Sequence, residues 1–238
     1  MKALILAGGL GTRLRSIAQD VPKPMVPVHG KPFLEHQLEQ LKAQGFEDLV
    51  FCVSYLAEHI REHFGNGNRW GVRITYATEN QLLGTAGAIK NAHRYIEDTF
   101  LVLNGDSFLE IDFLAMVRSH RCRQHADSRV MGTVAVAATE DATSYGALEL
   151  AADGRILAFR EKQIDGPGWI NSGAYVLEPT VLDTIPTNRA TSIERDIFPT
   201  IVELGYHLFS HPLQGFFVDI GTPEGYRRFC QYAEERLR

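Results

Sequence analysis

The stretch LILAGGLGTRL at residues 4–14, followed by PKP at residues 22–24, decides the fold expected for this chain. The apolar residues 3–7 predict a buried strand, and the glycines that follow predict a tight loop at its carboxyl end. Glycine lets backbone N–H groups approach an anion closely, while Arg13 and Lys23 add positive charge. The stretch therefore favours a phosphate-binding loop over the alternative, a plain tight turn after the first strand.

The overall composition is that of an ordinary globular enzyme. The chain has 238 residues, of which 45% are hydrophobic and 22% charged, with a net charge of −5. This charge balance gives no basic footprint, so we expect no nucleic-acid partner. The three widely spaced cysteines fit neither a disulfide framework nor a C-x-x-C site. No apolar stretch approaches the length of a membrane span or a signal peptide, so we expect a cytoplasmic protein without a membrane partner.

Strand-like and helix-like patterns alternate through the first half of the chain. Short apolar or alternating runs predict strands, and apolar residues at helical spacing predict the helices between them. Such alternation predicts a doubly wound α/β fold, with a mostly parallel sheet and helices on both faces. Ligands of these sheets bind beyond the carboxyl ends of the strands. The expected strands are 3–7, 49–53, 72–76 and 100–103, and the expected helices are 31–44, a segment ending at 64, and 84–95.

The second half has a different texture, with short strands separated by turn residues. This pattern predicts an antiparallel insertion or lid that covers the ligand, within one domain spanning residues 1–238. The expected strands are 130–137, 147–150, 156–159, 174–177, 207–210 and 216–218, and the expected helices are 193–204 and 223–237.

Two acidic residues follow predicted strands in equivalent positions. Asp106 comes shortly after the strand 100–103, and Asp219 comes directly after the strand 216–218. Either acid alone is more simply explained as the cap of a turn or helix. Together with a basic glycine loop, however, a pair of hard carboxylate ligands favours Mg²⁺, with phosphate oxygens and water completing its coordination.

The histidines offer a weaker metal hypothesis. His59 and His63 stand four residues apart on a predicted helix, as zinc ligands can, but no third ligand is evident nearby. We therefore expect a solvated helix face there. A dinucleotide oxidoreductase is also disfavoured, because Leu14 stands where G-x-G-x-x-G requires its third glycine, and no acid ends the second predicted strand.

Six motifs, in order, carry a resemblance to a known family. The chain resembles the sugar-1-phosphate nucleotidyltransferases from residue 1 to about residue 228. The family's fold is Rossmann-like, which implies a nucleotide-binding half at about 1–125 and a β-rich, sugar-phosphate-binding half at about 126–238. The motifs are LAGGLGTRL with PKP downstream, LNGD at 103–106, YGALEL at 145–150, FREK at 159–162, NSGAYV at 171–176 and DIGTPEGY at 219–226.

The resemblance also implies substrates and roles. A nucleoside triphosphate and a sugar 1-phosphate would give a nucleotide sugar and pyrophosphate, with Mg²⁺ held by Asp106 and Asp219. Arg13 would contact the departing pyrophosphate and Lys23 the α-phosphate, so that Arg13, Lys23 and Asp106 form the catalytic set. The implied nucleotide-binding residues are Leu6, Gly8, Gly9, Gly11, Thr12, Arg13, Lys23, Glu79, Gly84 and Thr85. The implied sugar-phosphate-binding residues are Asn104, Gly146, Glu161, Lys162 and Asn171.

The substrate pair stays open between related alternatives. If Glu79 faces the base, its carboxylate can accept from both N1–H and the amine of guanine, which favours GTP over UTP. The chain looks most like the D-glycero-α-D-manno-heptose 1-phosphate guanylyltransferases. Mannose-1-phosphate guanylyltransferase and N-acetylmuramate-1-phosphate uridylyltransferase share most of these motifs and remain alternatives. A catalytically silent nucleotide-binding regulator is the alternative of another class. The expected assembly is a monomer or a homodimer.

Overall fold

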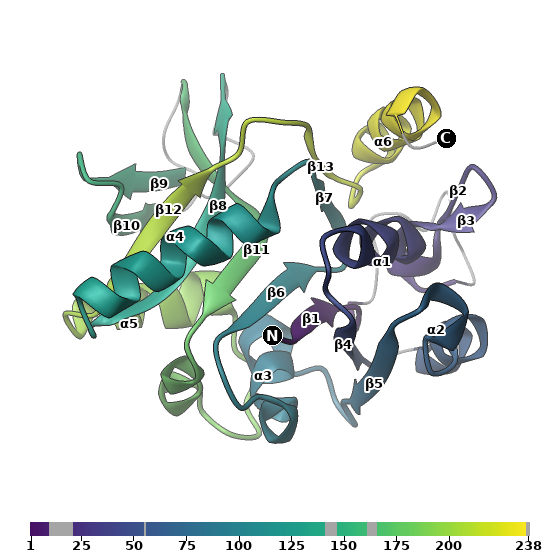
Figure 1. The fold of residues 1–238 in the computed structure, drawn as a ribbon, viewed down its shortest axis with the longest axis horizontal. Helices are drawn as coiled ribbons and strands as arrows, with labels where there is room; N and C mark the ends of the chain where they lie inside the picture. The colour runs from purple at the N-terminus through teal and green to yellow at the C-terminus, as the bar shows by residue number, and fades with distance from the viewer. Residues whose placement is uncertain (10–20, 55, 141–146, 161–165, 237–238) are drawn as a thin grey trace.

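A parallel sheet forms the centre of the molecule, as the sequence predicts. The computed structural model describes residues 1–9, 21–54, 56–140, 147–160 and 166–236. Within these ranges nine strands form one sheet (Figure 1). Its parallel strands lie in the order β6-β1-β4-β5, so that strands distant in sequence are neighbours in space. They are β1 (Ala3–Leu6), β4 (Asp48–Val53), β5 (Arg73–Thr78) and β6 (Phe100–Asn104).

Helices cover both faces of this sheet, which confirms the doubly wound prediction. Successive residues of β1 face opposite sides of the sheet, because side chains alternate along a strand. Ala3 and Ile5 join the core under α1 (Phe33–Ala43), α2 (Ala57–Phe64) and α4 (Phe113–Ala126). Leu4 joins the core under α3 (Gly84–Asn91) and α5 (Phe198–Glu203). All three side chains are fully buried, which explains the continuous apolar run in the sequence.

The second half is rich in antiparallel strands, as predicted, but the expectation of an insertion or lid is wrong, because these strands continue the main sheet. Strand β11 pairs antiparallel with β6, with Ala174 opposite Leu103, and also pairs with β8 and β9. Strand β12 pairs parallel with β8, so this half is mixed. The strands of this half are β8 (Val130–Thr139), β9 (Ala147–Leu150), β10 (Ile156–Arg160), β11 (Gly168–Leu177) and β12 (His207–Pro212).

A small second sheet brings the end of the chain back to the end of β6. Strand β7 (Ser107–Leu109) pairs antiparallel with β13 (Phe217–Asp219), so that Ser107 lies opposite Asp219. Helix α6 (Pro223–Arg236) covers this pair through a separate apolar cluster that includes Phe108 and Phe229. The pairing places Asp219 beside Asp106.

The remaining elements are short, and several expected helices differ in their bounds. The expected helix 193–204 is a π-helical turn followed by α5, and the expected helix 84–95 ends at Asn91 before a 3-10 turn. Helix α4 was not anticipated, although the Asp112 side chain caps it by accepting from the Ala115 N–H at 2.8 Å. The short elements are β2 (Pro27–Val28), β3 (Lys31–Pro32), η2 (Lys23–Met25), η3 (Asn68–Trp70), η4 (His93–Tyr95), η5 (Pro179–Thr184) and η6 (Ile193–Ile197).

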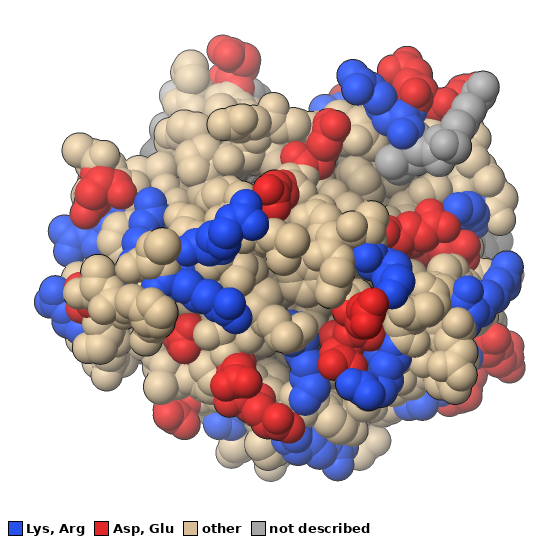
Figure 2. Space-filling model, viewed as in Figure 1, with Lys and Arg blue, Asp and Glu red and all other residues tan. Residues whose placement is uncertain are grey.

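The surface charges and the helices of the structure can be compared with the expectations about nucleic-acid and membrane partners. Figure 2 shows basic and acidic side chains interspersed over one face of the molecule. Among the helices of the described residues, none combines the length and apolarity needed to cross a bilayer.

His63 does not lie on a purely solvated helix face, because its Nε2 atom lies 2.8 Å from Oε2 of Glu35. Two packed helices, α1 and α2, are thereby joined.

Candidate active site

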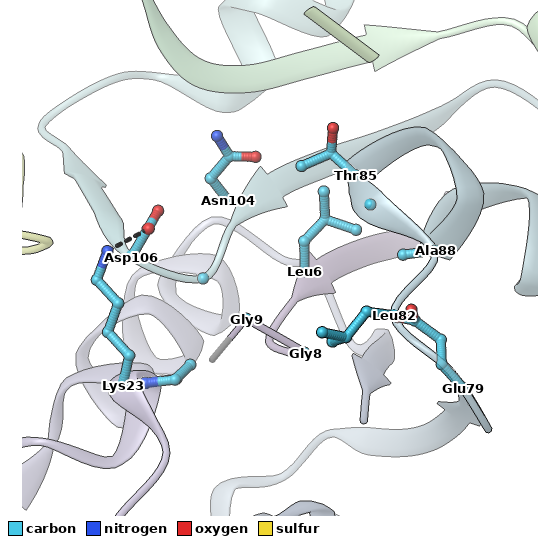
Figure 3. A pocket seen from close by; sticks show the side chains of 13 residues that line it. Leu6, Gly8, Gly9, Lys23, Glu79, Leu82, Thr85, Ala88, Asn104 and Asp106 are labelled. Carbon is cyan, nitrogen blue, oxygen red and sulfur yellow. Dashed lines mark hydrogen bonds and ion pairs between the residues drawn. The ribbon is translucent and has the colours of Figure 1, made fainter. Parts of the chain in front are cut away.

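The candidate active site lies at the carboxyl ends of the parallel strands, where the sequence predicts it. Gly8 follows β1, Glu79 follows β5 directly, and Asn104 ends β6. These ends open into a first cavity of about 380 Å³ (Figure 3). Its lining includes the predicted nucleotide-binding residues Leu6, Gly8, Gly9, Lys23, Glu79, Gly84 and Thr85. The other three, Gly11, Thr12 and Arg13, lie outside the part of the chain that the structure describes.

Crowding at the start of the glycine loop explains why glycine stands at position 8. The Ser54 hydroxyl donates to the Gly8 carbonyl at 2.6 Å. A Cβ on Gly8 would lie 3.0 Å from the Ser54 Oγ and 3.2 Å from Oε1 of Glu79. A side chain there would displace one of these groups, so the loop keeps its close approach to both.

Glu79 is a buried carboxylate on the wall of the first cavity. Only 8% of the residue is exposed, and its Oε2 atom accepts from the Leu83 N–H at 3.0 Å. Burial raises the pKa of this carboxyl above its usual range, and the hydrogen bond from Leu83 opposes part of that shift. Gly84, which follows Leu83, has φ +72°, and a Cβ added there would lie 2.6 Å from the Thr191 carbonyl oxygen. Only glycine fits this turn into α3.

Lys23 brings the two predicted metal-binding acids together. It begins the short helix η2 and is 8% exposed. Its ammonium contacts Oδ2 of Asp106 in a close ion pair and lies 3.5 Å from Oδ1 of Asp219. The Asp219 carboxylate also accepts from the Gly221 N–H at 2.6 Å. Figure 3 shows Lys23 reaching Asp106 at one end of the cavity, with Asn104 nearby.

A second cavity, of about 550 Å³, opens beside the first. Asn104 and Asp106 line both cavities, while Asn171 and Asp219 line the second. Asn171 stands at a register shift in β11, where Gly173 adopts φ +83°. The other predicted sugar-phosphate residues, Gly146, Glu161 and Lys162, lie outside the described residues.

Among the described residues, sequence reasoning missed the three other charged residues that line the second cavity. Arg160, Glu194 and Arg195 line it, and the two arginines supply positive charge to that wall. Arg160 lies within the motif FREK, where only Glu161 and Lys162 were singled out. Glu194 and Arg195 stand near the start of an expected helix, and no spacing in the sequence distinguishes them from residues of an exposed helix face.

The comparison with protein families decides the family of this chain. A family model described as "Nucleotidyl transferase" matches residues 2–236. The chain belongs to the nucleotidyl transferase family. The resemblance carried by the six sequence motifs is thereby confirmed, and the relatives of this nucleotidyl transferase include sugar-1-phosphate nucleotidyltransferases.

Individual relatives cover the chain almost completely. It is 36% identical to D-glycero-alpha-D-manno-heptose 1-phosphate guanylyltransferase of Campylobacter jejuni, over 96% of this chain and 98% of that protein. It is 40% identical to the mannose-1-phosphate guanylyltransferase catalytic subunit beta of Xenopus tropicalis, over 98% of this chain. The chain spans 61% to 68% of the length of several longer curated relatives.

A solved structure shows the same fold. The crystal structure of HddC from Yersinia pseudotuberculosis, described as complexed with GMP-PN, superposes with a TM-score of 0.83 at 35% sequence identity. The match covers 97% of this chain and 98% of that chain. The Rossmann-like nucleotidyltransferase fold predicted from the sequence is therefore confirmed.

The acids of this nucleotidyl transferase fit a divalent cation. Asp106 and Asp219 already converge on one positive charge, the Lys23 ammonium, and carboxylate oxygens are the ligands that Mg²⁺ prefers. No group of three metal-ligating side chains occurs among the described residues. A cation held here would therefore take its remaining ligands from phosphate oxygens and water, as Mg²⁺ in nucleotide sites usually does.

Proposed function

We propose that this protein transfers a nucleotidyl group from a nucleoside triphosphate to a sugar 1-phosphate, giving a nucleotide sugar and pyrophosphate. The observation that carries the proposal is the junction of the two cavities, which share Asn104 and Asp106 as walls. Two substrates bound side by side would meet at this junction. Lys23 lines the first cavity there and pairs with Asp106 and Asp219.

The chemistry asks little of the protein beyond positioning and charge. An oxygen of the sugar phosphate attacks the α-phosphorus, the bond from that phosphorus to the α,β-bridging oxygen breaks, and pyrophosphate leaves. A phosphomonoester has its second pKa near ~6, so the nucleophile is already largely ionised at neutral pH and needs no general base. We assign Lys23 to the α-phosphate, Arg13 to the departing pyrophosphate and Lys162 to the sugar phosphate, where each cation reduces repulsion between two polyanions.

The proposed cofactor is Mg²⁺, held by Asp106 and Asp219. When bound, it would supply positive charge to the phosphate oxygens and help to align the triphosphate. The convergence of both carboxylates on one ammonium group supports this assignment.

GTP is the proposed nucleotide donor, with UTP as the alternative. The Glu79 carboxylate lines the first cavity, and it matches the two N–H donors of guanine better than the single N–H of uracil. Two of the relatives described above are named guanylyltransferases.

The proposed acceptor is D-glycero-α-D-manno-heptose 1-phosphate. The Campylobacter relative that carries this sugar in its name matches the present chain in length as well as in sequence. Mannose 1-phosphate is the alternative, because the Xenopus relative is 40% identical, and N-acetylmuramate 1-phosphate with UTP is a third pair. We further propose a cytoplasmic protein, a monomer or homodimer, that works as one domain over residues 1–238.

Pyrophosphate release tests the proposal directly. The protein is incubated with each of the four ribonucleoside triphosphates and a panel of sugar 1-phosphates, with Mg²⁺ present, and Asp106→Asn serves as the inactive control. We expect release with GTP and heptose 1-phosphate. Inactivity of GTP with every sugar would overturn the guanylyl assignment but leave the reaction class, whereas nucleotide binding without any release would favour a silent regulator.

A variant at Glu79 sharpens the choice of base. Glu79→Gln presents one acceptor and one donor, which suits the carbonyl and N–H of uracil better than the two donors of guanine. We expect the ratio of kcat/KM for GTP over UTP to fall about tenfold, the size of one mismatched hydrogen bond. An unchanged ratio would remove Glu79 from base recognition.

A further inference from the structure

A carboxylate on the wall of the second cavity collects three hydroxyl groups. Oε2 of Glu194 accepts from the Thr85 hydroxyl at 2.8 Å and from the Ser192 hydroxyl at 2.7 Å. Its Oε1 accepts from the Tyr175 hydroxyl at 3.1 Å. These partners come from α3, from β11 and from the start of η6, so Glu194 joins three elements at one point.

Thr85 makes this carboxylate a link between the two cavities. Thr85 lines the first cavity and Glu194 lines the second. The Thr85 oxygen accepts from the Ile193 N–H at 2.8 Å while its hydrogen goes to Glu194. The hydroxyl therefore both donates to and accepts from η6, which lies more than 100 residues further along the chain. Figure 3 shows Thr85 on the same wall of the first cavity as Asn104.

The backbone of η6 is shaped to present Glu194. This element is a π-helical turn, a rare conformation that is frequent at functional sites. The Ser192 carbonyl accepts from both the Asp196 N–H at 3.1 Å and the Ile197 N–H at 3.3 Å, and the Ser192 side chain caps Arg195 N–H at 3.2 Å. The wider turn places Glu194 toward Thr85 and Tyr175 instead of continuing a regular helix face.

The hydrogen bonds beyond Glu194 run in one direction only. Tyr175 is fully buried, and burial, with the charge of Glu194, raises the pKa of its phenol well above the usual value, so it keeps its proton. That single proton goes to Glu194, so the Tyr175 oxygen can only accept, and it accepts from Nδ2 of Asn171 at 3.0 Å. Oδ1 of Asn171 then accepts from the Gly173 N–H at 2.9 Å. The negative charge of Glu194 thereby directs Nδ2 of Asn171 to the Tyr175 oxygen and leaves Oδ1 for the Gly173 N–H.

We propose that Glu194 is a positioning residue that fixes the Asn171 amide for the sugar 1-phosphate, and that Thr85 anchors Glu194 from the nucleotide side. This inference rests on the proposed function, because it concerns the acceptor pocket of that reaction. With its two internal bonds made, the Asn171 amide keeps one N–H and one lone pair for a ligand in the second cavity. A reversed amide would offer the wrong group and would leave its donors facing the Gly173 N–H.

The test compares Glu194→Gln, Thr85→Val and the double variant with the unmodified protein. A glutamine cannot accept from all three hydroxyls, and valine has the shape of threonine without the hydroxyl. We expect each single variant to raise the KM for sugar 1-phosphate about tenfold, equivalent to one buried hydrogen bond. In Glu194→Gln the dissociation constant for GTP, measured by titration calorimetry without sugar phosphate, should change less than twofold. The double variant should be no worse than Glu194→Gln alone, because both act through one contact.

Two controls separate positioning from a loss of structure. Thr85→Ser restores the hydroxyl and should return the KM for sugar 1-phosphate toward the unmodified value. Thr184→Val removes a hydroxyl that donates locally to the Val181 carbonyl at 2.7 Å, away from both cavities, and should leave that KM unchanged. Circular dichroism of every variant establishes that the fold is kept.

The outcomes distinguish this inference from the proposed function. An unmodified protein that turns over no triphosphate with any sugar 1-phosphate overturns the proposed function and this inference with it. Normal turnover with an unchanged sugar-phosphate KM in Glu194→Gln overturns the positioning role alone. Fully additive effects of the two substitutions also overturn it, since Thr85 would then act independently of Glu194. Equal losses for GTP and sugar phosphate in Glu194→Gln overturn it as well, since the effect would then not be specific to the acceptor pocket.

Discussion

Lys23 is an ammonium group held away from water by two carboxylates. Burying such a group is costly unless it is paired, and here Asp106 and Asp219 both lie within contact distance. The same lysine lines the first cavity, so its charge is placed where phosphate would arrive. A catalytic role requires that the ammonium exchange part of its contact with Asp106 for phosphate oxygens, which is reasonable because Asp106 is 33% exposed.

Replacing this lysine should affect the chemical step more than substrate binding. We expect Lys23→Ala to lower kcat at least 100-fold, comparable to the loss of one preorganised charge at a reacting group, while KM changes only a few-fold. Lys31→Ala is the control, because Lys31 forms an exposed ion pair with Glu39 at 2.6 Å. Steady-state kinetics of both variants provide the measurement. Unchanged turnover in Lys23→Ala would remove this residue from catalysis.

Glu79 should reduce the stability of the protein at neutral pH. Its pKa is raised by burial in the folded state, so folding favours the protonated form. The protonated Glu79 carboxyl therefore favours the folded state, and this contribution to the free energy of unfolding is complete below the ordinary pKa of glutamate, near ~4. The contribution is lost as pH rises through the raised pKa of the folded state.

Glu79→Gln imitates the protonated carboxyl and tests this linkage. We expect its melting temperature to exceed that of the unmodified protein by a few degrees at pH 7.5, and the difference to shrink as pH falls toward ~4. Glu97→Gln, at a carboxylate whose side chain is 79% exposed, should show no such gain. A difference in melting temperature that does not depend on pH would contradict the linkage.

At the scale of elements, local patterns predicted the strands but not their partners. The apolar runs at β1, β4 and β6 identify buried strands, because strands covered on both faces must be apolar throughout. Strand β11 has an apolar run of the same kind, but the sequence of that run does not indicate that its last residues pair with β6. Pairing depends on contacts between segments some 70 residues apart, so the sequence suggested an antiparallel insertion or lid within the domain.

The residues of the candidate site also fall into those that the sequence could predict and those that it could not. Asp106 and Asp219 could be singled out because each stands at the end of an apolar run, although Asp219 ends β13 of the small second sheet and not a strand of the parallel sheet. Their proximity depends on the pairing of β7 with β13, which joins segments about 110 residues apart. Thr85 was predicted from the family resemblance, whereas Glu194 was missed because its hydroxyl partners Thr85 and Tyr175 lie on other elements.

The bulge in β11 gives a prediction about an element. Gly173 has φ +83°, and a Cβ there would lie 2.9 Å from Nδ2 of Asn104. Gly205 has nearly the same angle, φ +81°, with open space around it. Both alanine variants pay for the left-handed backbone, about 1 kcal/mol, but only Gly173→Ala must also displace Asn104.

Urea unfolding and turnover of the two alanine variants separate strain from crowding. We expect Gly205→Ala to lose about 1 kcal/mol of unfolding free energy and keep its activity. Gly173→Ala should lose about 2 kcal/mol or more and most of its turnover, since Asn104 lines both cavities. Equal losses of stability and activity in the two variants would show that the bulge has no special role.

For the whole molecule, the pairing of β6 with β11 makes the two halves parts of one sheet. The core on one face takes Leu4 from β1 together with Tyr175 from β11. The core on the other face takes Ile5 from β1 together with Val176 from β11. Since each of these two large apolar clusters of the described residues draws on both halves, the halves should lose their structure together.

The two tryptophans of the sequence report on this cooperativity, because one stands in each half. Trp70 packs against the core that contains Ile5, and Trp169 against the core that contains Leu4. In Trp169→Phe and in Trp70→Phe, the remaining tryptophan's fluorescence and the far-ultraviolet circular dichroism are followed through urea unfolding. We expect the two signals to share one midpoint within each variant, because a single cooperative transition moves every probe at once. A fluorescence midpoint that departs from the circular dichroism midpoint in either variant would show that its half unfolds separately, and the halves would then have to be treated as two domains.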